Sequence, residues 1–167
     1  GLACLRLHIV TARGGVRFED PNVPAGTSAF DEKNVMVQFA SVFCVLDPLS
    51  FRDVLSLKMG VLINALVENR ILNLFPICEH LVSTNDHTSR VFADVALAYL
   101  VEHMDAIGQP VVSSRASNIT FQLFRSVFMS VAKFPDNEHA LRPYLAAIVT
   151  RTVTLAADAS FSMHYLT

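Results

Sequence analysis

Apolar residues recur at steps of three and four along most of the chain from residue 31 onward, and no segment sustains an alternation of apolar and polar residues. Val35, Phe39 and Val42 follow this spacing, and Leu123 and Val127 repeat it much later. A period of three to four places apolar side chains on one face of an α-helix, whereas a half-buried strand needs a period of two. The pattern therefore predicts an all-α protein.

Prolines, glycines and capping residues mark the ends of these helices. Asp47-Pro48 ends the first apolar segment, because proline disfavours helix at the residue before it. Ser50 and Asp53 have the spacing of a capping box at the start of the second helix. Pro76 bends or starts the third, and Gly108-Gln109-Pro110 ends the fourth. The pattern predicts about seven helices, six of them within residues 31–46, 50–69, 71–83, 88–106, 114–134 and 137–158.

Short connections group these helices into pairs. Helices linked by a few residues lie antiparallel and adjacent, and each pair takes up roughly 40 residues, the period of HEAT and armadillo repeats. We therefore predict an α-α superhelix of HEAT/armadillo-like antiparallel helix pairs, a fragment of a longer solenoid. Residues 1–167 form a single segment of this kind, in which residues 13–30, rich in Gly, Pro and Asp, form a loop or insertion.

The composition suggests that the helices are covered by neighbours. Apolar residues make up 52% of the chain and charged residues only 17%, against roughly 25% charged residues in ordinary globular domains. The cysteines Cys4, Cys44 and Cys78 are far apart among apolar residues. This is typical of reduced core thiols in an intracellular protein and not of a disulfide framework.

The distribution of charge argues against nucleic acid and membrane as partners. The net charge is −2, and the 13 Lys and Arg residues are spread singly along the chain. A phosphate-binding face needs clustered cations. No apolar stretch approaches the roughly 18 to 20 residues that cross a bilayer, and no signal-peptide pattern is visible. We predict no direct nucleic-acid binding and no membrane association.

The stretch KFPDNEHALRPY, residues 133–144, is the strongest candidate for chemistry. Asp136, Glu138 and His139 could serve acid–base catalysis if a cleft held them opposite a substrate. However, consecutive residues on one turn point in different directions, and no nucleophile stands at a supporting spacing. A structural interpretation is stronger: Pro135 stops one helix, Asp136 caps the next, and Glu138 lies at its positive end.

Cys78, His80 and His87 are candidates for a metal site, but no partner pair stands at zinc-site spacing. Gly14-Gly15 and Gly108 match neither a P-loop nor a Rossmann fingerprint, and no hydrolase, metalloprotease or kinase motif occurs. We predict no catalytic, cofactor-binding or metal-binding residues, no cofactor, no small-molecule substrate and no enzyme activity. The chain is instead predicted to be a scaffold whose stacked helix pairs offer a curved surface to other proteins.

Three strings carry a resemblance to a known family. They are Phe39–Phe43 with Leu46–Phe51 (FASVF, LDPLSF), Phe121–Val131 (FQLFRSVFMSV), and Asp136–Tyr144 (DNEHALRPY). Their order and spacing are similar to those of the TRRAP family, the transformation/transcription domain-associated proteins. That family has F-A-x-V-F with N-P-L-T-F, then L-x-L-F-K-x-V-F, then E-N-E-x-x-L-x-P-H. The resemblance spans roughly residues 35 to 160 and departs from the family at Asp47 and Tyr144, where the family has asparagine and histidine.

The resemblance implies a divergent member and a segment of the long N-terminal HEAT-repeat solenoid of a PI3K-related pseudokinase. Such proteins are nuclear scaffolds of SAGA-type and MYST-type histone acetyltransferase complexes. The implied function is a non-catalytic scaffold segment of a TRRAP-like transcription coactivator in the nucleus. Its implied partners are other protein subunits or transcription activators. Two alternatives stay open: a solenoid segment of a catalytically active PI3K-related kinase, and a generic HEAT/armadillo transport or phosphatase scaffold. No catalytic residue is carried over, since the matched positions are packing and turn residues.

Overall fold

The computed structural model describes residues 29–69, 73–106 and 114–157. These residues form six α-helices and two short 3-10 helices, with no strand among them. In chain order the elements are α2 (Ala29–Ser41), η1 (Phe43–Val45), α3 (Pro48–Glu68), α4 (Phe75–Ser83), α5 (Asp86–Glu102), η2 (Met104–Ala106), α6 (Ser114–Lys133) and α7 (Asn137–Ala157). The prediction of an all-α fold is confirmed.

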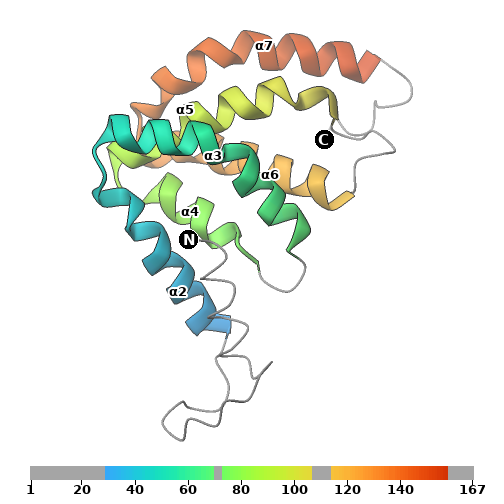
Figure 1. Cartoon of the computed structure of the whole chain (residues 1–167). Coiled ribbons are helices and arrows are strands. Elements are labelled where there is room, and N and C mark those ends of the chain that lie inside the picture. The colour runs from blue at the N-terminus through green and yellow to red at the C-terminus, as the bar shows by residue number, and fades with distance from the viewer. Residues whose placement is uncertain (1–28, 70–72, 107–113, 158–167) are drawn as a thin grey trace, which may run out of the picture.

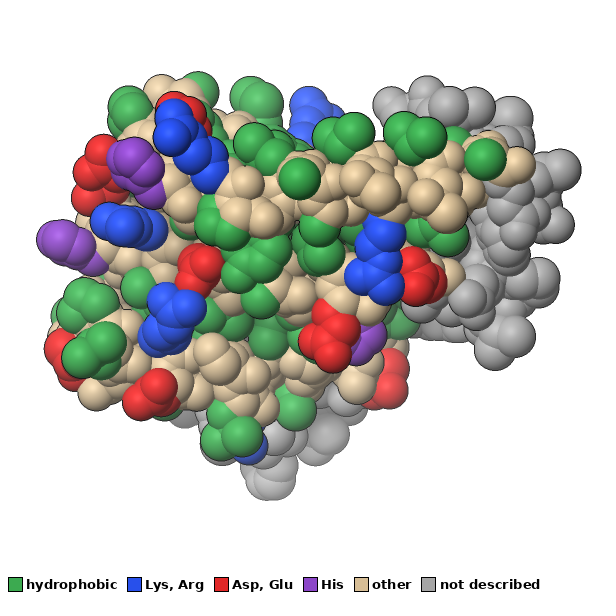
Figure 2. Space-filling view, turned by 90° about the horizontal axis from the view of Figure 1, so that it is seen from above, with side chains coloured by type: hydrophobic (Ala, Val, Ile, Leu, Met, Phe, Trp, Pro, Cys, Tyr) green, Lys and Arg blue, Asp and Glu red, His purple; other side chains and the backbone are tan. Residues whose placement is uncertain are grey.

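The helices stack in two layers. In one layer α4 packs against α2 and α6, and in the other α5 packs against α3 and α7 (Figure 1). Contacts of α4 with α5, α5 with α6 and α6 with α7 join the layers. Figure 2 looks onto the layer of α3, α5 and α7. Consecutive helices thus alternate between layers, as the helix pairs of a solenoid do. The predicted superhelix of HEAT-like pairs is confirmed, the pairs being α2/α3, α4/α5 and α6/α7.

Helix α5 lies at the centre of the stack and packs against α3, α4, α6 and α7. Eight of its 17 residues are buried. Phe92 and Leu97 have no exposed surface, and Ala93 and Ala96 between them are equally buried. Small side chains at these two positions let the neighbouring helices approach closely. The large ones fill the space between helices, where each fully buried Phe or Leu contributes about 1.5–3 kcal/mol.

Side chains of the preceding turns cap α3 and α5. Oδ1 of Asp47 accepts hydrogen bonds from the N–H groups of Leu49 at 3.1 Å and Ser50 at 3.0 Å. Hydrogen bonds from Ser50, followed by that from the Leu49 N–H, lower the pKa of Asp47 below its ordinary value. Asn85 caps α5 in the same way, because its Oδ1 accepts from the N–H of Thr88 at 2.8 Å. These are the residue types that helix starts prefer.

The predicted end of the first helix and start of the second are wrong. The helix predicted over 31–46 runs from Ala29 to Ser41, where the Val42 N–H bonds to the Phe39 carbonyl three residues back and the chain tightens into η1. The second helix begins at Pro48 and is capped by Asp47, not by a capping box at Ser50. Proline suits the first position of a helix, because the N–H that it lacks would have no partner there.

The other predicted boundaries fare better. Helix α4 begins at Phe75, next to Pro76 as predicted but four residues after the predicted start at residue 71. Helices α6 and α7 end within one residue of the prediction. The helix predicted over 88–106 begins earlier, at Asp86, and gives way to η2 after Glu102. Of the predicted loop at 13–30, residues 29 and 30 belong to α2 and the rest lie outside the described residues. The loop at 13–28 and the stop at Gly108–Pro110 therefore stay predictions.

Candidate interaction surfaces

The enzyme-like stretch at residues 133–144 forms the corner between α6 and α7. Asp136 comes directly before α7, and its carbonyl oxygen accepts from the His139 N–H at 3.1 Å. The side chains of Asp136, Glu138 and His139 are all exposed. Glu138 lies in the first turn of α7 and forms an ion pair of 3.1 Å with Arg142, one turn later. The corner thus uses these residues for a turn and a surface ion pair.

Asn137, in the middle of this stretch, is the residue that the corner buries. Its side chain has no exposed surface. Its Nδ2 donates to the hydroxyls of Ser89 on α5 at 2.8 Å and Ser130 on α6 at 2.7 Å. These hydroxyls donate in turn to the carbonyls of Val82 and Val127, both at 2.6 Å. The network joins the ends of four helices, and our sequence reasoning missed it.

The structure separates the candidate metal ligands. Cys78 is buried in α4, and this burial raises the pKa of its thiol to about 12. His80 faces α2, and His87 is exposed on the first turn of α5. Within the described residues, no three His, Cys, Asp or Glu side chains gather so that they could hold a metal ion. In the same part of the chain, no helix is long and apolar enough to span a membrane.

Among the described residues, Ser41 and His80 form the one contact that resembles a nucleophile and its base, with 2.9 Å between Oγ and Nε2. The Ser41 hydroxyl, however, donates its single proton to the Val37 carbonyl at 2.8 Å. His80 Nε2 is therefore the donor in this contact and cannot accept the serine proton. Burial lowers the pKa of His80 and favours its neutral form. The pair ties α2 to α4.

A polar cluster joins the three helices of the other layer. Arg52 of α3 forms an ion pair with Asp94 of α5. The Tyr144 hydroxyl of α7 donates to the second carboxylate oxygen of Asp94 at 3.3 Å. Burial, followed by the charge of Asp94, raises the pKa of Tyr144, so its hydroxyl stays protonated at neutral pH. The cluster therefore fixes how α3, α5 and α7 lie side by side.

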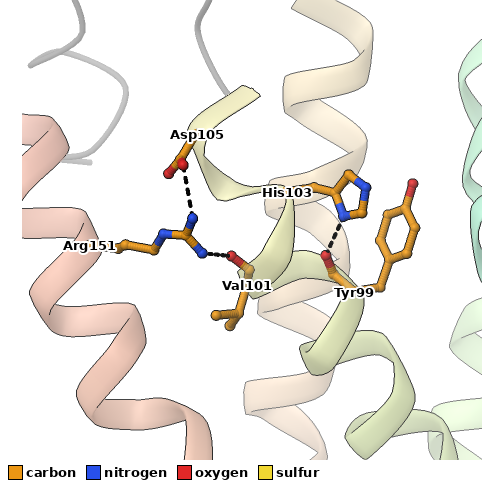
Figure 3. A network of polar contacts seen from close by, with 5 residues as sticks. All are labelled: Tyr99, Val101, His103, Asp105 and Arg151. Atoms are coloured by element: carbon orange, nitrogen blue, oxygen red, sulfur yellow. Dashed lines mark hydrogen bonds and ion pairs between the residues drawn. The ribbon is translucent and has the colours of Figure 1, made fainter.

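A second polar contact holds α7 to the far end of α5 (Figure 3). Arg151 donates to the Val101 carbonyl at 2.6 Å and forms an ion pair of 2.8 Å with Asp105 of η2. Beside it, the His103 ring stacks on Tyr99 with 4.0 Å between ring centroids. Polar side chains therefore link α7 to α5 at Asp94 and again at the far end of α5.

Large apolar side chains are exposed on the first and last helix pairs and on neither helix of the middle pair, within the described ranges. Figure 2 shows some of them along the edge formed by α7. We call the two sets the end faces of the stack. The first end face consists of Val42, Val45, Leu46, Leu49, Val54, Leu57 and Val61, and the second of Phe121, Phe128, Met129, Leu145, Val149 and Val153.

An apolar groove of about 360 Å³ lies at the first end face, between α2, α3 and α4. Phe39 and Phe43 form one wall, with their rings edge to face at 5.5 Å. Val54 and Leu62 of α3 lie opposite, and Lys58 is the one charged residue in the lining. In helix-in-groove complexes, grooves with apolar walls receive the apolar face of an amphipathic helix.

A family model of the Tra1 HEAT repeat central region matches the chain over residues 1–167. The chain belongs to the Tra1/TRRAP family. This match confirms the resemblance that the strings at residues 39–51, 121–131 and 136–144 predicted. It also agrees with the two-layer stack of helix pairs. No solved structure matches the chain significantly.

Relatives in the Tra1/TRRAP family come from animals and fungi. Transcription-associated protein 1 of Drosophila melanogaster is 32% identical over 127 residues, or 75% of this chain. The transformation/transcription domain-associated protein of Danio rerio is 32% identical over 136 residues, or 81% of this chain. The SAGA complex/NuA4 acetyltransferase complex subunit Tra1 of Schizosaccharomyces pombe is 30% identical over 137 residues, again 81%. The chain spans only 3–4% of the length of these relatives.

Proposed function

We propose that this chain is a non-catalytic scaffold segment of a Tra1/TRRAP-type transcription coactivator, and that it works through contact with other proteins. The placement of the exposed apolar side chains carries this proposal. They occupy the two end faces and are absent from α4 and α5 among the described residues. Contiguous apolar patches on a protein surface mark interaction sites, and stacked repeats bury such faces on their neighbours.

The names of relatives support the class of partner. The Schizosaccharomyces pombe and Saccharomyces cerevisiae relatives are named as subunits of the SAGA and NuA4 acetyltransferase complexes. We infer that the protein containing this segment assembles into a histone acetyltransferase complex in the nucleus. Other subunits or transcription activators are its partners there. The proposal includes no cofactor, no small-molecule substrate, no direct contact with nucleic acid and no membrane association.

Affinity purification of the full-length protein tests this assembly. The full-length protein without substitutions, the parent protein, is expected to co-purify with the subunits of a histone acetyltransferase complex and with acetyltransferase activity. A variant with Leu57→Lys and Val61→Lys places two charges on the first end face and is expected to recover less of the complex. Ser56→Lys, at an exposed position of the same helix outside the groove lining, is the matched control. Purification of the parent protein without any acetyltransferase subunit would contradict the proposal.

The non-catalytic assignment has a separate test in the 167-residue chain itself. The chain is expected to show neither kinase nor acetyltransferase turnover. The side chains that could act as acid or base, Asp136, Glu138 and His139, are exposed at a helix corner. Turnover that disappears when Asp136, Glu138 or His139 is replaced by alanine would overturn this assignment.

A further inference from the structure

The apolar groove between α2, α3 and α4 lies on an open side of the stack. Helices α2 and α3 diverge from the corner that joins them, because α2 packs against α4 while α3 packs against α5 and α6 (Figure 1). The lining is apolar apart from Lys58, and it includes Val54 and Val61, which are 43% and 57% exposed. Apolar surface of this kind favours an element that covers it.

The order of the layers indicates which element belongs in the groove. Consecutive helices alternate between the two layers, so a helix that precedes α2 falls in the layer of α3, α5 and α7. Helix α5 already lies on one side of α3 and contributes no residue to the lining of the groove. A helix from the chain before α2 would therefore lie on the other side of α3, where the groove is.

The sequence before α2 contains one segment that fits this place. Residues 1–28 lie outside the described residues, but their sequence places Leu2, Leu5 and Ile9 at steps of three and four. This is the spacing of one face of a helix. Residues 2–12 contain no Gly or Pro, whereas residues 13–28 are rich in both. The segment 2–12 is therefore the stretch before α2 that suits an amphipathic helix.

The lining of the groove favours a helix over a strand. Leu5, Leu7 and Ile9 also alternate with polar residues, as in a half-buried strand. A strand, however, would need partners for its backbone N–H and C=O groups, and the groove offers apolar side chains and one lysine. A helix pairs these groups internally and can present one apolar face to the groove.

The connection to α2 is long enough for this contact. Helix α2 has 13 residues and is therefore about 20 Å long, and Phe39 and Phe43 line the groove near its far end. The 16 residues of 13–28 can span up to about 55 Å when extended. Such a tether keeps the segment at a millimolar effective concentration, so that even a weak contact is well occupied.

We propose that residues 2–12 form a helix that fills the apolar groove, with Leu2, Leu5 and Ile9 facing α3. The helix covers the part of the first end face that lies between α2 and α3. It leaves Leu57, which lies outside the groove lining, exposed to other proteins. The inference does not depend on the proposed function, because the groove and its occupant belong to the same chain.

A nitroxide spin label on Cys4 of the 167-residue chain tests this inference by NMR. Cys44→Ser removes the other accessible thiol, since Cys78 is buried. The unpaired electron relaxes nearby nuclei, so the methyl signals of Val54 in the groove are expected to weaken severalfold. The methyl signals of Val153, on the second end face, are expected to keep their intensity. Reduction of the nitroxide gives the reference intensities.

Two variants of the segment distinguish its faces. On a helix, Leu5 lies in the stripe with Leu2 and Ile9, whereas Leu7 lies on the opposite face. Leu5→Asp is expected to lower the ratio of bound to free segment at least about tenfold, because a carboxylate replaces a buried leucine. The Val54 signals then recover. Leu7→Asp introduces the same charge and is the matched control, for which these signals stay weak.

Two variants of the groove form a second matched pair. Val61 lines the groove, whereas Leu57 on the same helix is more exposed and lies outside it. Val61→Asp is expected to release the segment and to restore the Val54 signals. Leu57→Asp is expected to leave them weak. Circular dichroism should find the same helix content in both variants, because both positions are exposed.

Three results would refute the inference. The first is a Val54 signal that the label on Cys4 does not weaken, and the second is an equal effect of Leu5→Asp and Leu7→Asp, which would exclude a helix. The third is a weakened Val54 signal in an unlabelled, isotope-enriched chain mixed with the spin-labelled chain, which would assign the groove to a second copy. None of them bears on co-purification with an acetyltransferase complex, which tests the scaffold function separately.

Discussion

Helices α5 and α7 lie side by side in one layer, yet about half of α5 is buried and most of α7 is not. Eight of the 17 residues of α5 are buried, but only three of the 21 residues of α7, and these three lie near its start. Beyond them, Leu145, Val149 and Val153 recur every four residues on an exposed stripe. Both sequences are apolar at helical spacing. The comparison teaches that position in the stack, and not the apolar pattern of a helix, decides whether a stripe becomes core.

The same comparison indicates which helix stabilises the fold and which offers a surface to other proteins. Helix α5 has a neighbour on either side in its own layer and two across it, whereas α7 has only α5 beside it in its layer and packs against α6 across it. In a solenoid, stability is approximately a sum over interfaces between neighbouring repeats. We therefore expect α5 to carry most of the cooperative core, and α7 to offer a face for contact.

Truncation of a leucine gives the largest expected difference between the two helices. Leu97→Ala in α5 removes a side chain with no exposed surface, which is expected to cost about 3–5 kcal/mol of unfolding free energy. Leu145→Ala in α7, at a side chain that is 40% exposed, is expected to cost under about 1 kcal/mol. Urea unfolding followed by circular dichroism measures both. Equal losses would refute the contrast between centre and end.

Disruption of the network at Asn137 is expected to give the next largest loss of unfolding free energy, because this network anchors the start of α7. Asn137→Ala leaves the buried hydroxyls of Ser89 and Ser130 without this donor, which is expected to cost about 1–3 kcal/mol. His139→Ala, at an exposed position two residues away, is the matched control and is expected to stay within about 0.5 kcal/mol of the parent. Thermal unfolding of the two variants measures both losses of stability. A larger loss for His139→Ala would show that the anchor is misassigned.

The Tyr144 hydroxyl is a smaller link between α5 and α7. Tyr144→Phe removes its hydrogen bond to Asp94, which is expected to cost about 1 kcal/mol at neutral pH. The pKa of Tyr144 is raised in the folded protein, so this contribution is present below the ordinary tyrosine pKa of about 10 and is lost as pH rises through the folded value. Above that pH the parent and Tyr144→Phe should converge in unfolding free energy. A constant difference between them at all pH values would argue against the assigned contact.

Gly60 of α3 gives the smallest expected effect and probes how tightly α3 packs on α5. A Cβ at this position would lie 3.5 Å from the nearest atom of the Tyr99 ring, which is an ordinary contact distance. Gly60→Ala is therefore expected to stabilise the protein by about 0.5 kcal/mol, because alanine loses less backbone entropy in a helix. Differential scanning calorimetry should find a slightly raised Tm. A lowered Tm would mean that the two helices approach more closely than the structure has them.

The sequence predicts the long helices well and the corners less well. Helices α6 and α7 were predicted within one residue because their apolar spacing is unbroken and Pro135 separates them. The junction of α2 and α3 was misplaced because Asp47-Pro48 both ends one segment and caps the next. A stop signal and a start signal can be the same two residues, and spacing alone does not tell them apart.

The buried network and the polar groove where α3, α5 and α7 begin could not be predicted for a different reason. Asn137 stands between an aspartate and a glutamate, and its partners Ser89 and Ser130 come from other helices. Arg52 and Arg90 are isolated in sequence, but α3 and α5 bring them to the same groove. Features that combine residues from different helix pairs depend on how the pairs stack. A single sequence does not supply that geometry.

Hydrogen exchange tests the central claim most directly, if it is measured both in the 167-residue chain and in the full-length protein that contains it. In the chain alone, amides of α5 are expected to exchange slowly and those in the second half of α7 quickly. In the full-length protein, α5 should be unchanged, while α3 and α7 at the end faces should gain protection. If α7 of the isolated chain is as protected as α5, or if the end faces gain nothing in the full-length protein, the account of a scaffold with covered end faces is contradicted.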